Sequence, residues 1–381
     1  MTPDIIRRIC TWYRAGRRDL PWRKTRDPYR VWVSEIMLQQ TRASAVIPYY
    51  SRFLKRLPRV EDLAVCPDDE LMKLWEGLGY YSRARHMKET AGIISERYGG
   101  IFPSDPETLR TLPGIGRYTA GAVASIAYGV PVAAVDGNVL RIMSRITCSG
   151  GDVLNDKVKR ETEEILTDAI GREADAGGED ENFPGDVNQG FMDLGATVCL
   201  PHTVPLCGEC PLAELCGAHR TGRESDFPVR KTAKRRKTEE RTVLLILDGD
   251  RVVLRKRPER GLLAGMYEYP CLDGFLTEKE ALRETERLGF EPVRIQPLPT
   301  AVHIFTHLEW HMTGYKVNVA SFRTGAENEK DSGIFLVDIR TAEKKYAIPS
   351  AFRVYSSVLY GSDNDRVRSR AVQKSARDAF I

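Results

Sequence analysis

The sequence predicts a mostly helical N-terminal domain followed by a smaller α+β domain. From residue 1 to about 170, apolar residues recur at intervals of three and four, with Pro or Gly between the segments. From about residue 243, apolar and polar residues alternate instead, as they do in half-buried strands. Between the two regions, residues 218–241 are polar and basic, so we expect a linker there.

The helical pattern of the first domain is interrupted once. Residues 171–186 are rich in glycine and acidic side chains and have no periodicity, so we expect a solvated loop. The helical pattern then returns over residues 187–198. The clearest helical segments are 43–57, 68–75, 83–98 and 118–128.

In the second domain, residues 243–247 and 251–257 predict two strands joined by a tight turn. Residues 281–288 predict a helix, and the alternation over 301–319 predicts a pair of strands. We therefore expect a helical domain at 1–217, a basic linker at 218–241, an α+β domain at 242–361 and a mobile tail at 362–381.

Composition and charge place few limits on function. The formal net charge is +4, and residues 218–241 carry nine basic against four acidic residues, so the rest of the chain is nearly neutral. Net charge alone therefore does not indicate a nucleic-acid partner. The sequence has no run of 18 apolar residues, and charges stand where a signal peptide would be apolar. We expect no membrane contact and a cytoplasmic protein, at the nucleoid in a bacterium, or a nuclear one in a eukaryote.

Four cysteines are crowded into one short segment: Cys199, Cys207, Cys210 and Cys216. Their spacing, C-x7-C-x2-C-x5-C, brings four soft ligands together, and these ligands alone permit either zinc or a 4Fe–4S cluster. The alternatives are free buried thiols, or a redox CxxC pair that would need a βαβ context the sequence lacks. The other cysteines are scattered, which does not suggest a disulfide framework.

A glycine-rich hairpin, Leu112-Pro113-Gly114-Ile115-Gly116, separates two helical segments. Its glycines, Gly114 and Gly116, allow a tight turn with outward N–H groups, and the helix that follows adds its positive N-terminus. Such a turn can hold a DNA phosphate without long basic side chains. The alternative is an ordinary turn between helices.

The order of these motifs resembles that of the helix-hairpin-helix DNA glycosylases with an iron–sulfur loop, and in detail the adenine DNA glycosylases of the MutY type. The resemblance covers roughly residues 1–360 and implies a 4Fe–4S cluster on the four cysteines. The further matching segments are LPWR at 20–23, VWVSEIMLQQT at 31–41, GLGYY at 77–81 and VDGN at 135–138. Two features depart from the family pattern, namely the first cysteine gap of seven residues instead of six and the insertion at 171–186.

Two carboxylic acids fit the chemistry of glycosidic cleavage, which needs an acid for the leaving group and negative charge beside the sugar cation. Glu35 lies in the apolar stretch 32–38, where burial would raise its pKa and keep it protonated, whereas Asp136 would stay ionised. Taken singly, Glu35 also fits a solvated helix position and Asp136 a turn or helix cap. The resemblance places the family's catalytic acid at Glu35 and its catalytic aspartate at Asp136.

The resemblance implies roles for further residues. Those placed around the reacting sugar are Tyr118 and Asn138. Those that line the adenine pocket are Trp22, Arg23 and Gln189. Those that insert beside the opposing base, once adenine has left the helix, are Gln40, Thr41, Leu78 and Tyr80. For Leu78 and Tyr80, core packing is the alternative.

The second domain resembles the Nudix-like domain of the same family, through residues 261–266 and the motif that recognises 8-oxoguanine, here Phe305, Thr306 and His307. Threonine replaces the usual serine at Thr306 but keeps the hydroxyl. Residues 283–289 are a poor version of the Glu-rich Nudix metal box, so we expect binding without hydrolase activity. An alternative metal face on one strand is formed by His303, His307, His311 and Glu309.

Three functions compete at this point. The first is monofunctional excision of adenine opposite 8-oxoguanine or guanine in duplex DNA, by a monomer. The second is a glycosylase/lyase similar to endonuclease III, which uses a lysine just after the hairpin, where this chain has Tyr118 and so cannot form a Schiff base. The third is a metal-stabilised DNA-binding module without activity, against which the pair Glu35 and Asp136 speaks.

Overall fold

The computed structural model describes residues 3–177, 180, 182–201, 203–230, 236–322 and 333–360, and these form two compact units. The first unit comprises Met1–Cys66 and Arg85–Ala233. The second unit comprises Pro67–Ala84 and Lys234–Phe380, so it takes in a segment from the N-terminal half of the chain. No helix of the described residues is long and apolar enough to span a bilayer.

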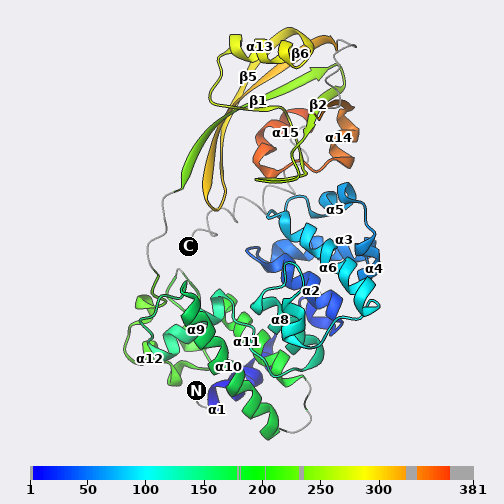
Figure 1. Ribbon diagram of the computed structural model, residues 1–381. Helices are drawn as coiled ribbons and strands as arrows, with labels where there is room; N and C mark the ends of the chain where they lie inside the picture. Colours follow the sequence, from blue (N-terminus) through cyan, green and yellow to red (C-terminus); the bar gives the residue numbers. More distant parts are fainter. Residues whose placement is uncertain are drawn as a thin grey trace. The chain divides into compact units, whose positions relative to one another are not determined.

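The first unit is helical (Figure 1), as the sequence predicts. Its helices are α1 (Pro3–Gly16), α2 (Pro28–Leu38), α3 (Ala43–Arg56), α4 (Val60–Ala64), α6 (Ser82–Tyr98, which begins in the second unit), α7 (Pro106–Arg110), α8 (Arg117–Tyr128), α9 (Gly137–Thr147), α10 (Asp156–Gly177), α11 (Phe183–Thr197) and α12 (Gly217–Arg220). Its 3-10 turns are η1 (Pro21–Lys24), η2 (Cys207–Glu209), η3 (Ala213–Leu215) and η4 (Glu224–Asp226).

One core of the first unit is built from α1, α9, α10 and α11. Ile6 and Ile9 of α1 are completely buried against Ile170 of α10 and Phe191 of α11. Helices α8 and α11 meet almost backbone to backbone, because a Cβ on Gly185 would lie 2.9 Å from the Cα of Ile126. This close packing places the C-terminal end of α8 beside the start of α11.

The prediction of a solvated loop at residues 171–186 is wrong for most of that segment. Helix α10 continues to Gly177 and α11 begins at Phe183. The acidic side chains are tied to α1, because Arg7 pairs with Glu173, and Arg14 lies 2.7 Å from both Asp180 and Asp186. The basic partners are more than 160 residues away, so a local sequence pattern cannot indicate them. Their ion pairs hold the acidic segment against α1.

The second unit is built around a seven-stranded sheet of order β3-β2-β1-β6-β5, with β4 paired to β1 and β7 to β2. Strands β1 and β6 run parallel, whereas β5 and β6 form a long antiparallel hairpin. The strands are β1 (Lys237–Asp248), β2 (Arg251–Lys256), β3 (Tyr267–Glu268), β4 (Cys271–Asp273), β5 (Phe290–Ile304), β6 (Leu308–Phe322) and β7 (Ile334–Asp338). The predicted strand, turn and strand at 243–257 are confirmed, and the hairpin is longer than the predicted 301–319.

Helices cover both faces of this sheet (Figure 1), which explains the continuous apolar run of β1. Leu244 and Ile246 pack towards α13 (Glu278–Arg287), which confirms the predicted helix. Val243 and Leu245 pack on the opposite side, in one core with residues of α14 (Ile339–Lys345), η6 (Ser350–Phe352) and α15 (Arg353–Tyr360). The α+β class predicted for this part of the chain is therefore confirmed.

The segment 67–84 belongs to the second unit because its helix α5 (Asp68–Trp75) makes polar contacts there. Lys73 donates to the carbonyl of Tyr346 at 3.1 Å, and the Tyr267 hydroxyl donates to Asp69 at 3.1 Å. A third bond joins the amide of Ile348 to the carboxylate of Glu76 at 3.0 Å.

The predicted linker and tail are only partly described. Ala218 and Phe227 are buried in the first unit, where Arg145 donates to the carbonyl of Phe227 at 3.2 Å. The segment up to residue 230 therefore packs on the helical unit, and β1 already begins at Lys237. The predicted tail, residues 362–381, lies outside the described residues.

Candidate active site

Glu35 lies on α2, a helix that is buried on nearly every side. The helix begins at Pro28, and the side chain of Asp27 caps it by accepting the amide of Arg30 at 3.0 Å. Glu35 is only 4% exposed, between the buried Trp32 and Met37. The prediction that the apolar run buries this carboxyl group is confirmed, so the solvated alternative is excluded.

The partner of Glu35 is Tyr118, in the first turn of α8. The hydroxyl of Tyr118 donates to Oε2 of Glu35 at 2.5 Å and lies 3.8 Å from the sulfur of Met192 on α11. Burial raises the pKa of Glu35, while the bond from Tyr118 opposes that rise. Burial and the neighbouring carboxylates hold the pKa of Tyr118 well above its usual value, so Tyr118 keeps its proton and donates.

Asp136 precedes α9 and caps it. Its Oδ1 accepts the amide of Val139 at 2.8 Å, and its Oδ2 accepts the side-chain amide of Asn138 at 2.8 Å. Burial raises the pKa of Asp136, and these bonds and Arg141 oppose the rise. Burial outweighs the donors in this shift, and the expectation that Asp136 is ionised stays a prediction. Asp136 can therefore both cap α9 and take part in catalysis, because Oδ1 accepts the amide of Val139 while Oδ2 accepts the side chain of Asn138.

Sequence reasoning missed Arg141, which is buried behind Asn138. It donates to Oδ1 of Asn138 at 2.8 Å, to the carbonyl of Gly195 at 2.9 Å and to the carbonyl of Cys199 at 2.9 Å. A continuous set of hydrogen bonds thus joins Asp136 to the backbone of the first cysteine. The spacing of Asn138 and Arg141, three residues apart on one helix, is the signal that could have revealed this pair.

Of the three residues predicted to line an adenine pocket, Arg23 lies near Glu35. Arg23 is close enough for its charge to lower the pKa of Glu35, and it donates to Asp193 at 2.8 Å and to Tyr13 at 2.7 Å. Trp22 is buried with its ring edge against Tyr50, at 5.5 Å between ring centroids. The third residue, Gln189, is half-buried on α11. Asp193, which holds Arg23, was also missed by the sequence analysis.

The hairpin at residues 112–116 is a tight turn fastened to α6. Gly114 has a φ of +73°, and a Cβ there would lie 2.7 Å from the Cβ of His86, so both conformation and space require glycine. Thr90 of α6 donates to the carbonyl of Pro113 at 2.7 Å. Gly116 is the N-cap residue of α8 and is exposed, as is Arg117, so the N-terminus of α8 is accessible.

Two further predicted residues, Gln40 and Thr41, directly follow α2 in the first unit. Gln40 has a φ of +56°, and the hydroxyl of Thr41 donates to the carbonyl of Gln39 at 3.3 Å. The chain therefore turns sharply at the end of the helix that carries Glu35.

The remaining residues predicted to meet the opposing base lie in the second unit. Tyr80 is 46% exposed, whereas Leu78 is 6% exposed and packs as the core alternative expects. The hydroxyl groups of Tyr80 and Thr306 are 3.2 Å apart. Phe305 packs on the buried Trp310 at 5.0 Å, while Thr306 and His307 are exposed in the turn between β5 and β6.

The alternative metal face of histidines is not formed in the described part of the chain. His307 lies in the turn, His303 on β5 and His311 on β6, so they do not share one strand. No group of three ligand atoms comes together there among the described residues. On α13, Glu284 is paired with Arg287 at 2.7 Å, which further weakens the Nudix metal box.

The four clustered cysteines lie within electrostatic reach of one another. Burial raises the pKa of Cys207 and of Cys210 to about 11, and the other thiols of the cluster add to both shifts. Arg145 donates to Sγ of Cys199 at 3.1 Å and brings positive charge to the thiols. A cationic metal centre would remove the mutual repulsion of four thiolates, so the donor set fits a four-thiolate centre.

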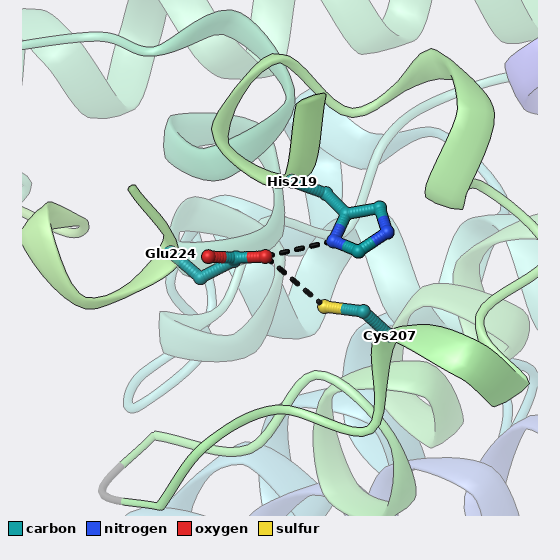
Figure 2. Close-up of side chains that lie close together, drawn as sticks. All are labelled: Cys207, His219 and Glu224. Carbon is teal, nitrogen blue, oxygen red and sulfur yellow. Dashed lines mark hydrogen bonds and ion pairs between the residues drawn. The ribbon is translucent and has the colours of Figure 1, made fainter. Parts of the chain in front are cut away.

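A second donor set shares Cys207 with the first (Figure 2). Nδ1 of His219 and Oε1 of Glu224 are 2.7 Å apart, and Sγ of Cys207 is 3.8 Å from the same oxygen. All three ligand atoms lie within 4.8 Å of one another. The two sets compete for Cys207, so the donors by themselves permit a four-thiolate centre or a mixed one.

Comparison with known proteins defines the class. Residues 33–168 match the model of the HhH-GPD superfamily of base excision DNA repair proteins, and residues 242–356 match the NUDIX domain. Together with the carboxyl groups of Glu35 and Asp136, these matches define a base excision DNA glycosylase that carries a Nudix-like domain.

Relatives make the family clear. The chain is 33% identical to the adenine DNA glycosylase of Rattus norvegicus, over 97% of this chain and 81% of that protein. It is 32% identical to the adenine DNA glycosylase of Buchnera aphidicola subsp. Schizaphis graminum, over 86% and 91%. A thermostable thymine-DNA glycosylase of known structure is 32% identical, with a TM-score of 0.49 over 57% of this chain and 95% of that one. The chain belongs to the family of adenine DNA glycosylases, which confirms the resemblance seen in the sequence.

Proposed function

We propose that this enzyme hydrolyses the N-glycosidic bond of adenine mispaired with 8-oxoguanine or guanine, and leaves the DNA strand uncut. The observation that supports this most directly is the cluster of the buried Glu35 with the half-buried Tyr118 and Asp136. Each member of the cluster is within electrostatic reach of the other two. A glycosidic bond needs one protonated and one ionised carboxyl group, and this cluster can supply both.

Glu35 serves as the general acid. Its buried carboxyl group holds a proton at a higher pH than an exposed one would, and Tyr118 fixes Oε2. The proton passes to N7 of the departing adenine, which leaves as a neutral base.

Asp136 stabilises the positive charge that develops on the sugar. The amide of Val139 and the side chain of Asn138 orient its two oxygens, and Arg141 in turn holds Asn138. Water then adds to the sugar cation, and the Glu35 carboxylate left after protonation of adenine takes up the proton that this water releases. Removal of Asn138 would therefore misplace Asp136 without removing its charge.

The reaction ends at hydrolysis because the chain has no amine at the position a lyase uses. Tyr118 stands there, and its hydroxyl donates to Glu35. A phenol cannot form the Schiff base that a glycosylase/lyase needs before it cleaves the strand.

The mispair is recognised on both sides. Adenine leaves the helix to reach Glu35, with Trp22, Arg23 and Gln189 around it. Gln40, Thr41 and Tyr80 meet the opposing base, whereas the buried Leu78 supports the loop from the core. Phe305, Thr306 and His307 distinguish 8-oxoguanine from guanine. The exposed hydroxyl pair of Tyr80 and Thr306 supports this assignment. Gly114 and Gly116 hold a DNA phosphate at the start of α8.

The metal centre would be a 4Fe–4S cluster held by Cys199, Cys207, Cys210 and Cys216. When bound, the cluster supplies a rigid anionic cross-link for the loop between α11 and α12. Arg145 donates to the sulfur of Cys199, and Arg141 donates to its carbonyl. These bonds couple the loop to α9.

One assay tests the proposed function. The protein is incubated with duplexes that carry 8-oxoguanine:A, G:A or thymine glycol, with and without borohydride. We expect release of adenine from the first two, no reaction on thymine glycol and no trapped adduct. A borohydride-trapped complex, or action on thymine glycol, would favour the lyase alternative.

A further inference from the structure

The loop Gly77–Tyr80 has a backbone that most sequences would not adopt. Gly77, Gly79 and Tyr80 all have positive φ, at +99°, +71° and +47°. Glycine tolerates this region, but a tyrosine at +47° is strained and persists only where its surroundings compensate. The loop presents the exposed Tyr80 to solvent. Without a stabilising contact nearby, the strained backbone would relax to a more favourable conformation.

Arg83, at the start of α6, provides that compensation. Its Nη2 donates to the carbonyl of Leu78 at 3.1 Å and to that of Gly79 at 3.0 Å, and its Nε donates to that of Tyr80 at 3.4 Å. Its own amide donates to the carbonyl of Tyr80 at 2.9 Å. One guanidinium therefore gathers three successive carbonyl groups of the loop, which only the planar fork of arginine can do.

Aromatic rings enclose the same guanidinium. Its carbon lies 5.3 Å from the centroid of Trp75 and 5.6 Å from that of Tyr80. Arg83 is 9% exposed, which keeps it away from a DNA phosphate, and burial lowers its pKa to about 10. It remains charged at neutral pH, so its bonds to carbonyl groups are the stronger, charge-assisted kind.

We propose that Arg83 is a positioning residue for adenine extrusion, and that it holds the loop Gly77–Tyr80 in the strained shape in which Tyr80 can insert beside the opposing base. The inference rests on the proposed function, because it assumes that Tyr80 enters the helix. A loop that is already shaped loses less conformational freedom when it inserts, so extrusion is easier. Arg83 acts only through the loop, and it has no contact with the reacting bond in this role.

The test compares two substrates that differ in the work of extrusion. One duplex carries adenine opposite 8-oxoguanine, and the other carries adenine opposite an abasic-site analogue, where no base has to be unpaired. Single-turnover rates are measured for Arg83→Gln, for Arg83→Lys and for the matched control Arg97→Gln, an exposed arginine of the same helix. Thermal midpoints are recorded for all three variants.

Arg83→Gln should lower the single-turnover rate on the first substrate by about tenfold or more, the ratio expected when one charge-assisted hydrogen bond is lost. The single-turnover rate on the second substrate should fall far less. Arg83→Lys keeps the charge without the fork and should fall between Arg83→Gln and the wild type, while Arg97→Gln should match the wild type.

Equal slowing of both substrates, or no slowing of either, would overturn the proposal. If Arg83→Gln fails to fold, the substrate ratio of Arg83→Lys decides. Failure of the proposed function is separate, because then the wild type would release adenine from neither duplex.

Discussion

Tyr118 donates a hydrogen bond of 2.5 Å to the carboxyl group of Glu35, across 83 residues of sequence. The donor stabilises the charged form of Glu35, while burial favours the protonated form. The pKa of Glu35 is raised on balance, so Tyr118 limits how far that pKa rises. This relationship makes the proton state of the proposed acid a property of two residues, and it can be tested from either one.

Replacing Glu35 by Gln should leave DNA binding intact but abolish adenine release. The amide has a similar shape and lacks the acidic proton, so we expect a loss of about 10²- to 10⁴-fold in single-turnover rate, as for other general acids. Glu89→Gln, at an exposed position on α6, is the control. A near-normal rate for Glu35→Gln would remove Glu35 from the mechanism.

The pH profile should have an alkaline limb that belongs to Glu35. Because its folded pKa lies above the ordinary 4.5, the folded protein holds this proton to a higher pH than the unfolded chain does. The stability contributed by Glu35 is therefore present at acid pH and is lost as the pH rises from 4.5 through the folded pKa. The rate of adenine release should decline over the same pH range, because Glu35 loses its proton there.

Tyr118→Phe should move that alkaline limb to higher pH. The substitution removes a donor that lowers the pKa of Glu35, so the acid stays protonated further up the scale. Single-turnover rates across pH measure the shift. A limb that stays in place or moves downward would contradict the assignment to Glu35.

Asp136→Asn should bind the lesion duplex and release adenine very slowly. Asparagine can still accept the amide of Val139, so α9 keeps its cap while the negative charge is lost. We expect a rate loss of about 10²-fold or more, the size seen when one electrostatic stabiliser is removed. Any residual activity should have its alkaline limb at lower pH, because the charge of Asp136 raises the pKa of Glu35.

Thr306 should contribute to the preference for 8-oxoguanine over guanine. Thr306→Val keeps the shape and loses the hydroxyl that faces Tyr80, so the preference should fall by about two- to tenfold, the range for one neutral hydrogen bond. Thr306→Ser should retain the preference. An unchanged ratio of the two rates in Thr306→Val would refute this role.

Cys210→Ser should lose both iron and the broad visible absorption of an iron–thiolate cluster. The thermal midpoint should fall as well, because the loop between α11 and α12 would lose its cross-link. Cys66→Ala, a buried cysteine far along the chain from the cluster, should keep the metal content. Stoichiometric zinc in place of iron in the wild type would contradict the iron–sulfur assignment.

The sequence predicts those parts of the fold and site that depend on local pattern. The apolar run around Glu35 indicates its burial, and the hairpin glycines indicate the turn at 112–116, because the cause lies within a few residues of the effect. Arg141, Asp193 and the pairing of α1 with residues 171–186 escape such reasoning. Each depends on a partner brought close only by folding, and a charged residue on a helix looks the same whether it meets water or a distant carboxylate.

The same limit applies to residues 67–84. Nothing in the sequence of α5 indicates that its partners are Tyr267, Tyr346 and Ile348, almost two hundred or more residues later. Its helical pattern is correctly predicted, but its membership of the second unit is not.

The polypeptide passes between its two units after Cys66, after Ala84 and after Ala233. A chimaera of two glycosylases spliced in the basic segment would therefore join α5 of one parent to the sheet of the other, with foreign partners for Asp69, Lys73 and Glu76. Residues 67–84 have to travel with the Nudix-like domain if the graft is to keep its native contacts. Recombination at the obvious boundary is thereby disfavoured, and the loop that carries Tyr80 is inherited together with the hairpin that carries Thr306.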